Sequence, residues 1–139
     1  MPSIIERSVP LYDKNWFKTG GDAQYYAAPS TADQFRDALV WACQQGLTCT
    51  LLGQGANVLI CDAGIPGLVI RPALYESTFQ VTGQKIVVTA GAGLSVAELI
   101  NACLAHGALG LEEFSGIPGT VGGSVFINIH YFEFLLSNF

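Results

Sequence analysis

The sequence predicts an α+β protein built from two small lobes, and two observations lead to that prediction. Strand and helix patterns are mixed in both halves of the chain, without the regular alternation of a doubly wound parallel sheet. A short stretch that contains a proline, residues 71–75, separates the two halves. We therefore expect a first α+β lobe over residues 1–72 and a second over residues 73–139.

The first half is predicted to hold one helix among strands. The stretch from Ser30 to Asp33 fits a capping box in which Ser30 is the N-cap and Asp33 stands where glutamate is usual. Apolar residues then recur at i, i+3, i+4 and i+7, as on one helical face: Phe35, Ala38, Leu39 and Ala42. Gly46 is expected to close the helix as its C-cap. Strand patterns cover residues 23–29, 48–53 and 64–72.

The second half repeats this mixture. The segment TFQVTGQKIVVTAG, residues 78–91, predicts two strands joined by a turn at residues 82–84. Ser95 to Glu98 forms a second capping box. A helical apolar face follows at Val96, Leu99, Ile100 and Cys103, and Gly107 ends the predicted helix.

Composition excludes several classes of function. Half of the 139 residues are hydrophobic and 12% are charged, which is typical of a globular domain. The chain has six Lys and Arg residues and a net charge of −5, so it cannot form the dense basic surface of a nucleic-acid-binding protein. Any phosphate bound here must therefore be held largely by backbone N–H groups.

The cysteines and the apolar runs indicate the compartment. The four cysteines have no metal-ligand spacing, so we expect them to be small buried hydrophobes in a reducing environment. No segment has the length of a membrane span or of a signal-peptide core. We expect a cytoplasmic protein with no metal, no membrane and no nucleic-acid partner.

Glycines gather in three loops, each of which follows a predicted strand or helix: residues 53–57, 90–93 and 116–123. Backbone N–H groups in such loops can converge on phosphate oxygens, and missing side chains allow a cofactor to approach closely. No GK[ST] follows any loop, and none matches the GxGxxG of a βαβ unit, so the common nucleotide folds are disfavoured. The residues alone therefore indicate a phosphate or dinucleotide site, with ordinary tight turns as the alternative.

Three stretches also carry a family resemblance: KTGGDAQYYAAP, LLGQGANVLICDAGIPGLVI and VTAGAGLSVAELINACLAHGALGLEEFSGIPGTVGG. They closely resemble the N-terminal, FAD-binding part of the UDP-N-acetylenolpyruvoylglucosamine reductases (UDP-N-acetylmuramate dehydrogenases), the MurB family. The resemblance runs from about Trp16 to Asn128. It implies the two-lobed α+β FAD-binding fold of the vanillyl-alcohol-oxidase or PCMH type, with a truncated second lobe and no substrate-binding domain.

The resemblance also implies roles for particular residues. The loop that cradles the FAD pyrophosphate would be Gly53, Gln54, Gly55, Ala56 and Asn57. The second flavin loop and the segment that continues past the flavin would be Gly116, Ile117, Pro118, Gly119, Thr120, Gly122, Gly123 and Asn128. A first-lobe motif matches Thr19, Gly20 and Gly21. Arg71 is either a further binding residue or a surface arginine at a strand end, and the glycines around Gly122 either face FAD or lock a structural turn.

The implied activity needs residues that this chain does not contain. In the family reaction NADPH reduces FAD, and the reduced flavin and a side-chain acid then reduce the enolpyruvyl double bond of UDP-N-acetylglucosamine enolpyruvate. The family's catalytic residues lie beyond the matched region, so no catalytic residue is assigned here. The chain also departs from the family at Ala56, where serine is usual, and at residues 130–133, where a small-residue segment is usual.

Three functions stay open at this point. The first is an FAD-binding fragment or short relative of the reductase, which is not competent alone. The second is a subunit of another FAD-dependent oxidoreductase whose missing half comes from a partner chain. The third is a non-catalytic flavin-binding interaction module, in which the apolar residues 126–139 serve as a contact surface and allow self-association.

Overall fold

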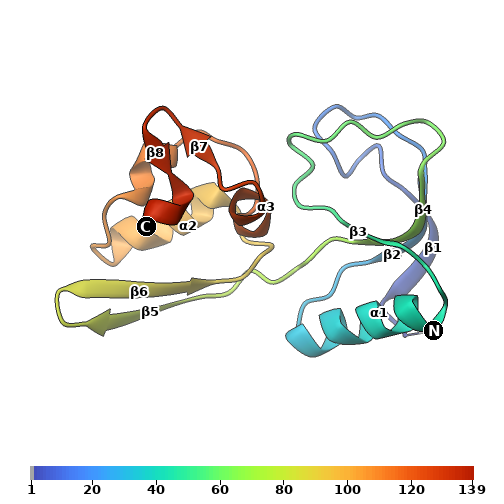
Figure 1. Cartoon of the computed structure of the whole chain (residues 1–139), viewed down its shortest axis with the longest axis horizontal. Helices are drawn as coiled ribbons and strands as arrows, with labels where there is room; N and C mark the ends of the chain where they lie inside the picture. The colour runs from blue at the N-terminus through green and yellow to red at the C-terminus, as the bar shows by residue number, and fades with distance from the viewer. Residues whose placement is uncertain (1) are drawn as a thin grey trace. The chain divides into compact units, whose positions relative to one another are not determined.

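A computed structural model describes residues 2–139, and the chain divides into two compact units on either side of the Leu74–Tyr75 bond. Sequence analysis had placed the junction at 72/73. Each unit contains helices and strands (Figure 1), so the predicted mixed α+β class is confirmed. No helix within the described part of the chain is long and apolar enough to cross a membrane.

Unit 1 is built on a four-stranded sheet with the order β1-β2-β4-β3. Its strands are β1 (Ile5–Pro10), β2 (Asp22–Ala27), β3 (Cys49–Leu51) and β4 (Ile65–Ile70). Strand β1 is antiparallel to β2, whereas β2, β4 and β3 are parallel to one another. The carboxyl ends of these three parallel strands therefore lie at one edge of the sheet.

Both faces of the sheet of unit 1 are buried, and the side chains of β4 point alternately to one face and to the other. Leu68 and Ile70 pack against Ala38 and Ala42 of helix α1 (Ala32–Gln44), which lies along one face of the sheet (Figure 1). Val69 points to the opposite face, into a second cluster that the loops of the unit cover: Leu11, Ala23, Tyr26, Leu52 and Ile60. This second face carries the loop residues discussed below.

The caps of α1 differ from the prediction by one residue. Thr31, not Ser30, is the N-cap, and its side chain accepts a hydrogen bond from the N–H of Gln34. The reciprocal bond comes from Gln34, whose side-chain oxygen accepts from the N–H of Ser30 at 2.9 Å, so Asp33 has no part in a box. Gln45 is the C-cap, and Gly46 follows it as the glycine of a Schellman motif, with Leu47 N bonded to Ala42 O at 2.9 Å.

Unit 2 combines a hairpin with short helices. Strands β5 (Ser77–Thr82) and β6 (Lys85–Ala90) form the predicted hairpin, and α2 (Val96–Ala105) is the predicted helix. The capping box of Ser95 and Glu98 is confirmed, because both reciprocal hydrogen bonds are present. The other elements were not predicted: η1 (Leu111–Phe114), α3 (Val121–Phe126), β7 (His130–Tyr131), β8 (Phe134–Leu135) and η2 (Leu136–Asn138).

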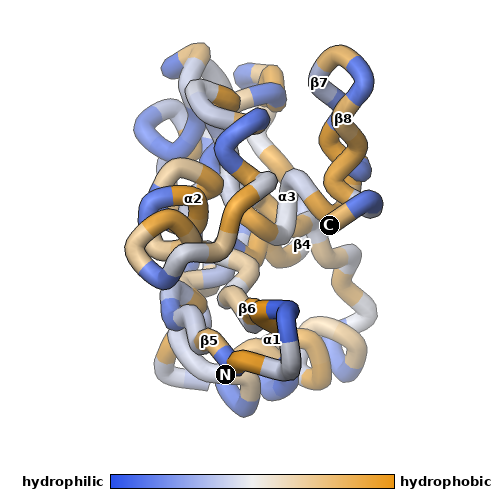
Figure 2. The backbone as a smooth tube through the Cα atoms, turned by 90° about the vertical axis from the view of Figure 1, so that its left-hand side faces the viewer, coloured by the Kyte–Doolittle hydropathy of each residue, from blue (hydrophilic) through white to orange (hydrophobic). Residues whose placement is uncertain are grey.

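The apolar C-terminal segment forms part of the core of unit 2. Ile129 is 7% exposed and packs with Val96, Ile100 and Phe114, while Phe134 and Leu136 lie against the same cluster. Figure 2 shows an orange, hydrophobic stretch of this segment at β8. The expectation that the segment is purely a contact surface is therefore wrong for these residues, although Phe126, Phe132 and Phe139 are exposed.

The cysteines also differ from the prediction. All four are free, but only Cys103 is buried. Cys43 lies near the end of α1 on its outer side, Cys49 on the edge strand β3, and Cys61 in the loop before β4, and all three are exposed. These three cysteines are exposed because they lie at the ends or edges of their elements, and composition does not reveal such positions.

Candidate functional site

The loop of residues 53–57 follows β3 in unit 1 and offers a row of backbone donors. Among residues 2–139, the N–H groups of Gly53, Gly55, Ala56 and Asn57 find no acceptor. Gly55 is buried, and Gly53 and Ala56 are half-buried. Because buried N–H groups in proteins are nearly always paired, this row is suited to an anion that accepts several hydrogen bonds.

Gly55 must be glycine for reasons of conformation and of space. Its φ is +70°, and a Cβ atom there would lie 2.7 Å from Asn15 Cα and 2.7 Å from Lys14 O. The loop is thus pressed directly against the segment that contains Asn15. The carbonyl of Gly55 also accepts a hydrogen bond from Trp16 N at 3.1 Å, which fixes the two segments together.

Asn15 holds this neighbouring segment in shape. It is 2% exposed, and its side-chain amide donates to the carbonyls of Leu11, at 2.7 Å, and Thr19, at 2.8 Å. Sequence analysis did not single out Asn15. The available signal was a polar residue between aromatic and apolar neighbours, and a buried asparagine needs partners of this kind.

The first-lobe motif lies next to the same segment. A Cβ atom at Gly20 would lie 2.6 Å from Cβ of Ile60, and one at Gly21 would overlap the carbonyl of Asp62. The hydroxyl oxygen of Thr19 is buried and has no hydrogen-bond partner among the described residues. Two predicted groups, residues 19–21 and 53–57, are therefore brought together in unit 1, around Asn15.

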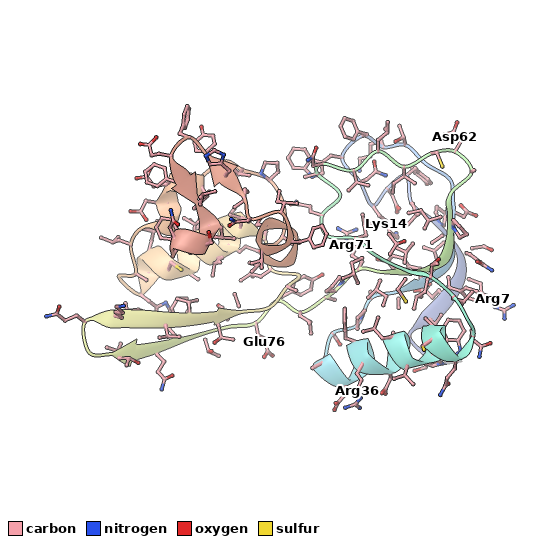
Figure 3. All side chains as sticks on the ribbon, viewed as in Figure 1. Arg7, Lys14, Arg36, Asp62, Arg71 and Glu76 are labelled. Atoms are coloured by element: carbon pink, nitrogen blue, oxygen red, sulfur yellow. The ribbon has the colours of Figure 1, made fainter. Side chains whose placement is uncertain are left out.

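Basic side chains gather around Tyr26, at the end of β2. The Nζ atom of Lys14 lies 5.5 Å from the centre of the Tyr26 ring, and Arg71 lies near enough to the Tyr26 hydroxyl to act on its pKa. Burial raises the pKa of Tyr26, and the two cations act in the opposite direction. Figure 3 shows Lys14 and Arg71 in the same part of unit 1, so Arg71 is not an isolated surface arginine.

Unit 2 brings the other two glycine loops together. The stretch 119–122 runs beside 92–96 as a short antiparallel pair, with Val96 N bonded to Gly119 O at 3.1 Å and Val121 N bonded to Leu94 O at 2.8 Å. Thr120, which is 9% exposed, is the N-cap of α3 and accepts a hydrogen bond from Gly123 N. The loop at 90–93 was predicted as a glycine loop, but its pairing with 119–122 was not.

The glycines of the segment 116–123 fall into two kinds. Gly116 and Gly119 have φ values of +86° and +138°, and the space beside Gly116 is open, whereas the nearest atom to a Cβ at Gly119 is 3.9 Å away. Gly122 differs, because a Cβ there would lie 2.9 Å from Ala92 Cβ and its N–H already donates to Ala92 O. Of the two roles left open for Gly122, the structure favours packing within the unit.

Asn128 is also engaged inside unit 2. Its amide donates to Ser137 Oγ at 3.2 Å, and its side-chain oxygen accepts from Ser137 N at 3.0 Å. This residue therefore fastens the C-terminal segment to the turn after α3. In the loop of Gly116, Ile117, Pro118 and Gly119, Gly116 has open space beside it, whereas Ile117 packs against the core of the unit.

The chemistry of these sites is that of binding. No cluster of His, Cys, Asp or Glu in the described chain could hold a metal ion. In unit 1, the unpartnered N–H row and the orphaned Thr19 hydroxyl fit a ligand that carries phosphate oxygens. In unit 2, the space beside Gly116 is open. Fold and sites together define a nucleotide-cofactor-binding module of the two-lobed α+β type.

Comparison with known proteins identifies the family within this class. Residues 23–133 match the family model described as FAD binding domain, and the chain belongs to that family. The predicted cofactor, FAD, is thereby confirmed.

Relatives in sequence include reductases that share one name. The UDP-N-acetylenolpyruvoylglucosamine reductase of Treponema pallidum (strain Nichols) is 40% identical over 127 residues, which cover 90% of this chain and 36% of that protein. The reductase of the same name from Synechococcus sp. (strain JA-3-3Ab) is 40% identical over 124 residues, or 89% of this chain and 39% of that protein. This chain thus spans about two fifths of the length of these relatives, and the predicted resemblance to an N-terminal FAD-binding part is confirmed.

Solved structures agree on the fold. The UDP-N-acetylenolpyruvylglucosamine reductase (MurB) of Thermus caldophilus superposes with a TM-score of 0.69 at 28% identity, over 91% of this chain and 43% of that one. A solvent-stable cholesterol oxidase superposes with a TM-score of 0.60 at 21% identity, over 76% of this chain and 21% of that one, which shows the fold alone. The predicted two-lobed FAD-binding fold is confirmed.

Proposed function

We propose that this chain is the FAD-binding part of a UDP-N-acetylenolpyruvoylglucosamine reductase. In its full-length form such an enzyme would use NADPH to convert UDP-N-acetylglucosamine enolpyruvate to UDP-N-acetylmuramate for cell-wall peptidoglycan, in the cytoplasm. The observation that carries the proposal is the row of four unpartnered N–H groups at residues 53–57, because a diphosphate is the part of FAD that needs such donors.

We assign a part of the cofactor to two of the predicted loops. Residues 53–57 bind the diphosphate through their N–H groups, with the Thr19 hydroxyl as a further donor. Gly116 and Gly119 leave room for the flavin to approach the backbone of the second loop. When bound, FAD supplies hydride transfer, while this chain binds and orients it.

The domain organisation follows from the same assignment. Residues 1–72 and 73–139 act as the two lobes of one FAD-binding domain, and substrate binding and proton donation belong to a part of a longer form that this chain lacks. The coverage of the relatives, 36% and 39%, supports this division of labour. We therefore propose that the chain alone binds FAD without turning over substrate.

Self-association remains a proposal for the exposed remainder of the apolar segment. Phe126 is 89% exposed and Phe132 is 72% exposed, and large apolar side chains of this kind favour burial against another surface. Sedimentation velocity over a range of protein concentrations tests this proposal. A single monomeric species at every concentration would contradict it.

Titration of the apo-protein with FAD, followed by flavin fluorescence, tests the function. The matched variants are Gly116→Ala and Gly83→Ala, because both glycines have positive φ and open space around them, and Gly83 lies in the β5–β6 turn. Both variants bear a similar cost of strain, but only Gly116→Ala places a methyl group at the proposed flavin loop. We expect FAD binding by the wild type and by Gly83→Ala, with weaker binding by Gly116→Ala; no binding by the wild type would refute the proposal.

A further inference from the structure

A pair of cations in unit 1 lies at the loop to which we assign the diphosphate. Lys14 lies over the ring of Tyr26, which is 7% exposed, and Arg71 is joined to the next residue of β2, its N–H donating to the carbonyl of Ala27 at 2.9 Å. The chain has only six Lys and Arg residues, so two of them on one buried tyrosine is a notable concentration of positive charge. Figure 3 shows the two labelled side chains in the same region of the unit.

The backbone connections tie both cations to residues 53–57. The carbonyl of Lys14 would lie 2.7 Å from a Cβ atom at Gly55, so Lys14 belongs to the segment that packs on the loop. Arg71 directly follows Ile70, whose carbonyl accepts a hydrogen bond from Leu52 N at 2.9 Å. Leu52 immediately precedes the loop, so Arg71 leaves the sheet beside the point where the loop begins.

One acid competes for this charge. Asp13 Oδ1 lies 3.1 Å from Lys14 Nζ, and the Lys14 side chain is 19% exposed whereas that of Asp13 is 53% exposed. The neighbouring Lys14 lowers the pKa of Asp13, so the carboxylate is charged at neutral pH. Its attraction to Lys14 opposes any movement of the lysine toward a bound anion.

We propose that Lys14 and Arg71, held on Tyr26, bind the diphosphate of FAD together with the N–H groups of residues 53–57. This inference rests on the proposed function and adds side-chain cations to a site that composition alone assigned to backbone donors. A cationic pair is needed because a diphosphate approaches a chain whose net charge is −5. Arginine suits a planar, two-point contact with phosphate, and lysine supplies a point charge.

The four residues around the site predict effects of different sign. Lys14→Gln and Arg71→Gln should each weaken FAD binding about tenfold, as loss of a charged hydrogen bond does. Asp13→Asn should strengthen binding, because it frees Lys14. Tyr26→Phe should weaken binding less than Arg71→Gln, because it keeps both cations and the ring beneath Lys14.

The test compares three ligands on the full chain. FAD and ADP carry the diphosphate and riboflavin does not, so the Lys14→Gln and Arg71→Gln losses should appear for FAD and ADP and be absent for riboflavin. The losses should also shrink as sodium chloride rises from about 0.05 M to about 0.5 M. Arg36→Gln is the matched control, because Arg36 lies on α1 and pairs with Asp33 at 2.9 Å. Urea unfolding of each apo-variant monitors the fold.

The outcomes separate this inference from the proposed function. Wild-type affinity for FAD in both Lys14→Gln and Arg71→Gln would overturn the inference alone, as would equal losses for riboflavin and ADP. If the wild type binds ADP through these cations but not FAD, the proposed function fails and the diphosphate site holds. If it binds neither FAD nor ADP, both are overturned.

Discussion

A substitution at Gly122 tests whether this glycine serves the fold or the cofactor. A Cβ atom at this position would lie 2.9 Å from Ala92 Cβ and 3.0 Å from Ala92 O. Ala92 cannot retreat freely, because its carbonyl accepts the hydrogen bond from Gly122 N at 3.0 Å. The collision is therefore inside unit 2, and we expect it to lower the stability of the apo-protein.

The magnitude follows from two opposing effects. Overpacking of this kind costs about 1–3 kcal/mol, whereas replacing a glycine inside a helix with alanine gains about 0.5–1 kcal/mol. For Gly122→Ala we expect a net loss of about 1 kcal/mol in the free energy of unfolding. For Gly122→Val we expect a loss of about 3 kcal/mol, because a β-branched side chain adds bulk and helix cost.

The measurement is urea unfolding of the apo-protein, followed by far-UV circular dichroism. Gly123→Ala is a matched control in the same helix, because the nearest atom to its Cβ, Thr120 Oγ1, is 3.5 Å away, an ordinary contact. That variant should be more stable than the wild type by about 0.5–1 kcal/mol. In the double variant Ala92→Gly with Gly122→Ala, the two changes should couple favourably by about 1 kcal/mol. A Gly122→Val apo-protein as stable as the wild type, with weakened FAD affinity, would refute the reasoning.

Three further predictions concern the caps, the buried amide and turnover. Ser95→Ala should lower the free energy of unfolding by about 1 kcal/mol at pH 7. Hydrogen bonds from Ser95 hold the pKa of Glu98 below its ordinary value of 4.5, so the stability that the capping box contributes is present above pH 4.5 and is lost as pH falls through the lowered pKa. Urea unfolding at pH 7 and in acid should therefore show that Ser95→Ala lowers the free energy of unfolding less in acid. An equal effect at both pH values would contradict the assignment. Asn15→Leu should cost about 1–3 kcal/mol, because it removes the donor to the Thr19 carbonyl and leaves the Leu11 carbonyl with the Lys14 N–H alone; unchanged thermal unfolding would show that Asn15 does not hold the segment. The chain with FAD, NADPH and UDP-N-acetylglucosamine enolpyruvate should form no more UDP-N-acetylmuramate than free FAD does, and product formation above that level would place the missing acid in this chain.

Local patterns predicted the elements whose signals are local. The capping box at Ser95 and the helical spacing that follows it define α2, and the turn at residues 82–84 defines the β5–β6 hairpin. Strand β1 escaped prediction because three polar residues in a row, Glu6, Arg7 and Ser8, interrupt its apolar pattern, and Ser8 has a φ of +51°. Helix α3 escaped because two of its six residues are glycine, which has a low helix propensity. The helix forms despite this because Thr120 caps it and because residues 119–122 pair with residues 92–96.

The candidate site was predictable as loops but not as contacts. Glycine spacing and family resemblance selected residues 53–57 and 116–123, both of which the structure leaves at least partly open. The roles of Asn15, Lys14 and Ala92 depend on segments that meet only after folding. No local pattern distinguishes Gly122, which packs on Ala92, from Gly116, which faces open space.

The antiparallel pairing of residues 92–96 with 119–122 has a consequence for the order of folding. Its hydrogen bonds join the segment at the start of α2 to a segment that follows α2 in the sequence. The loop at 116–119 therefore acquires its shape only after α2 has formed and packed. The amides of Val96, Val121 and Gly122 should then become protected from solvent exchange as one cooperative group, and later than those inside α2. In a nascent chain, the loop at 116–119 would thus reach its final shape only after this late closure.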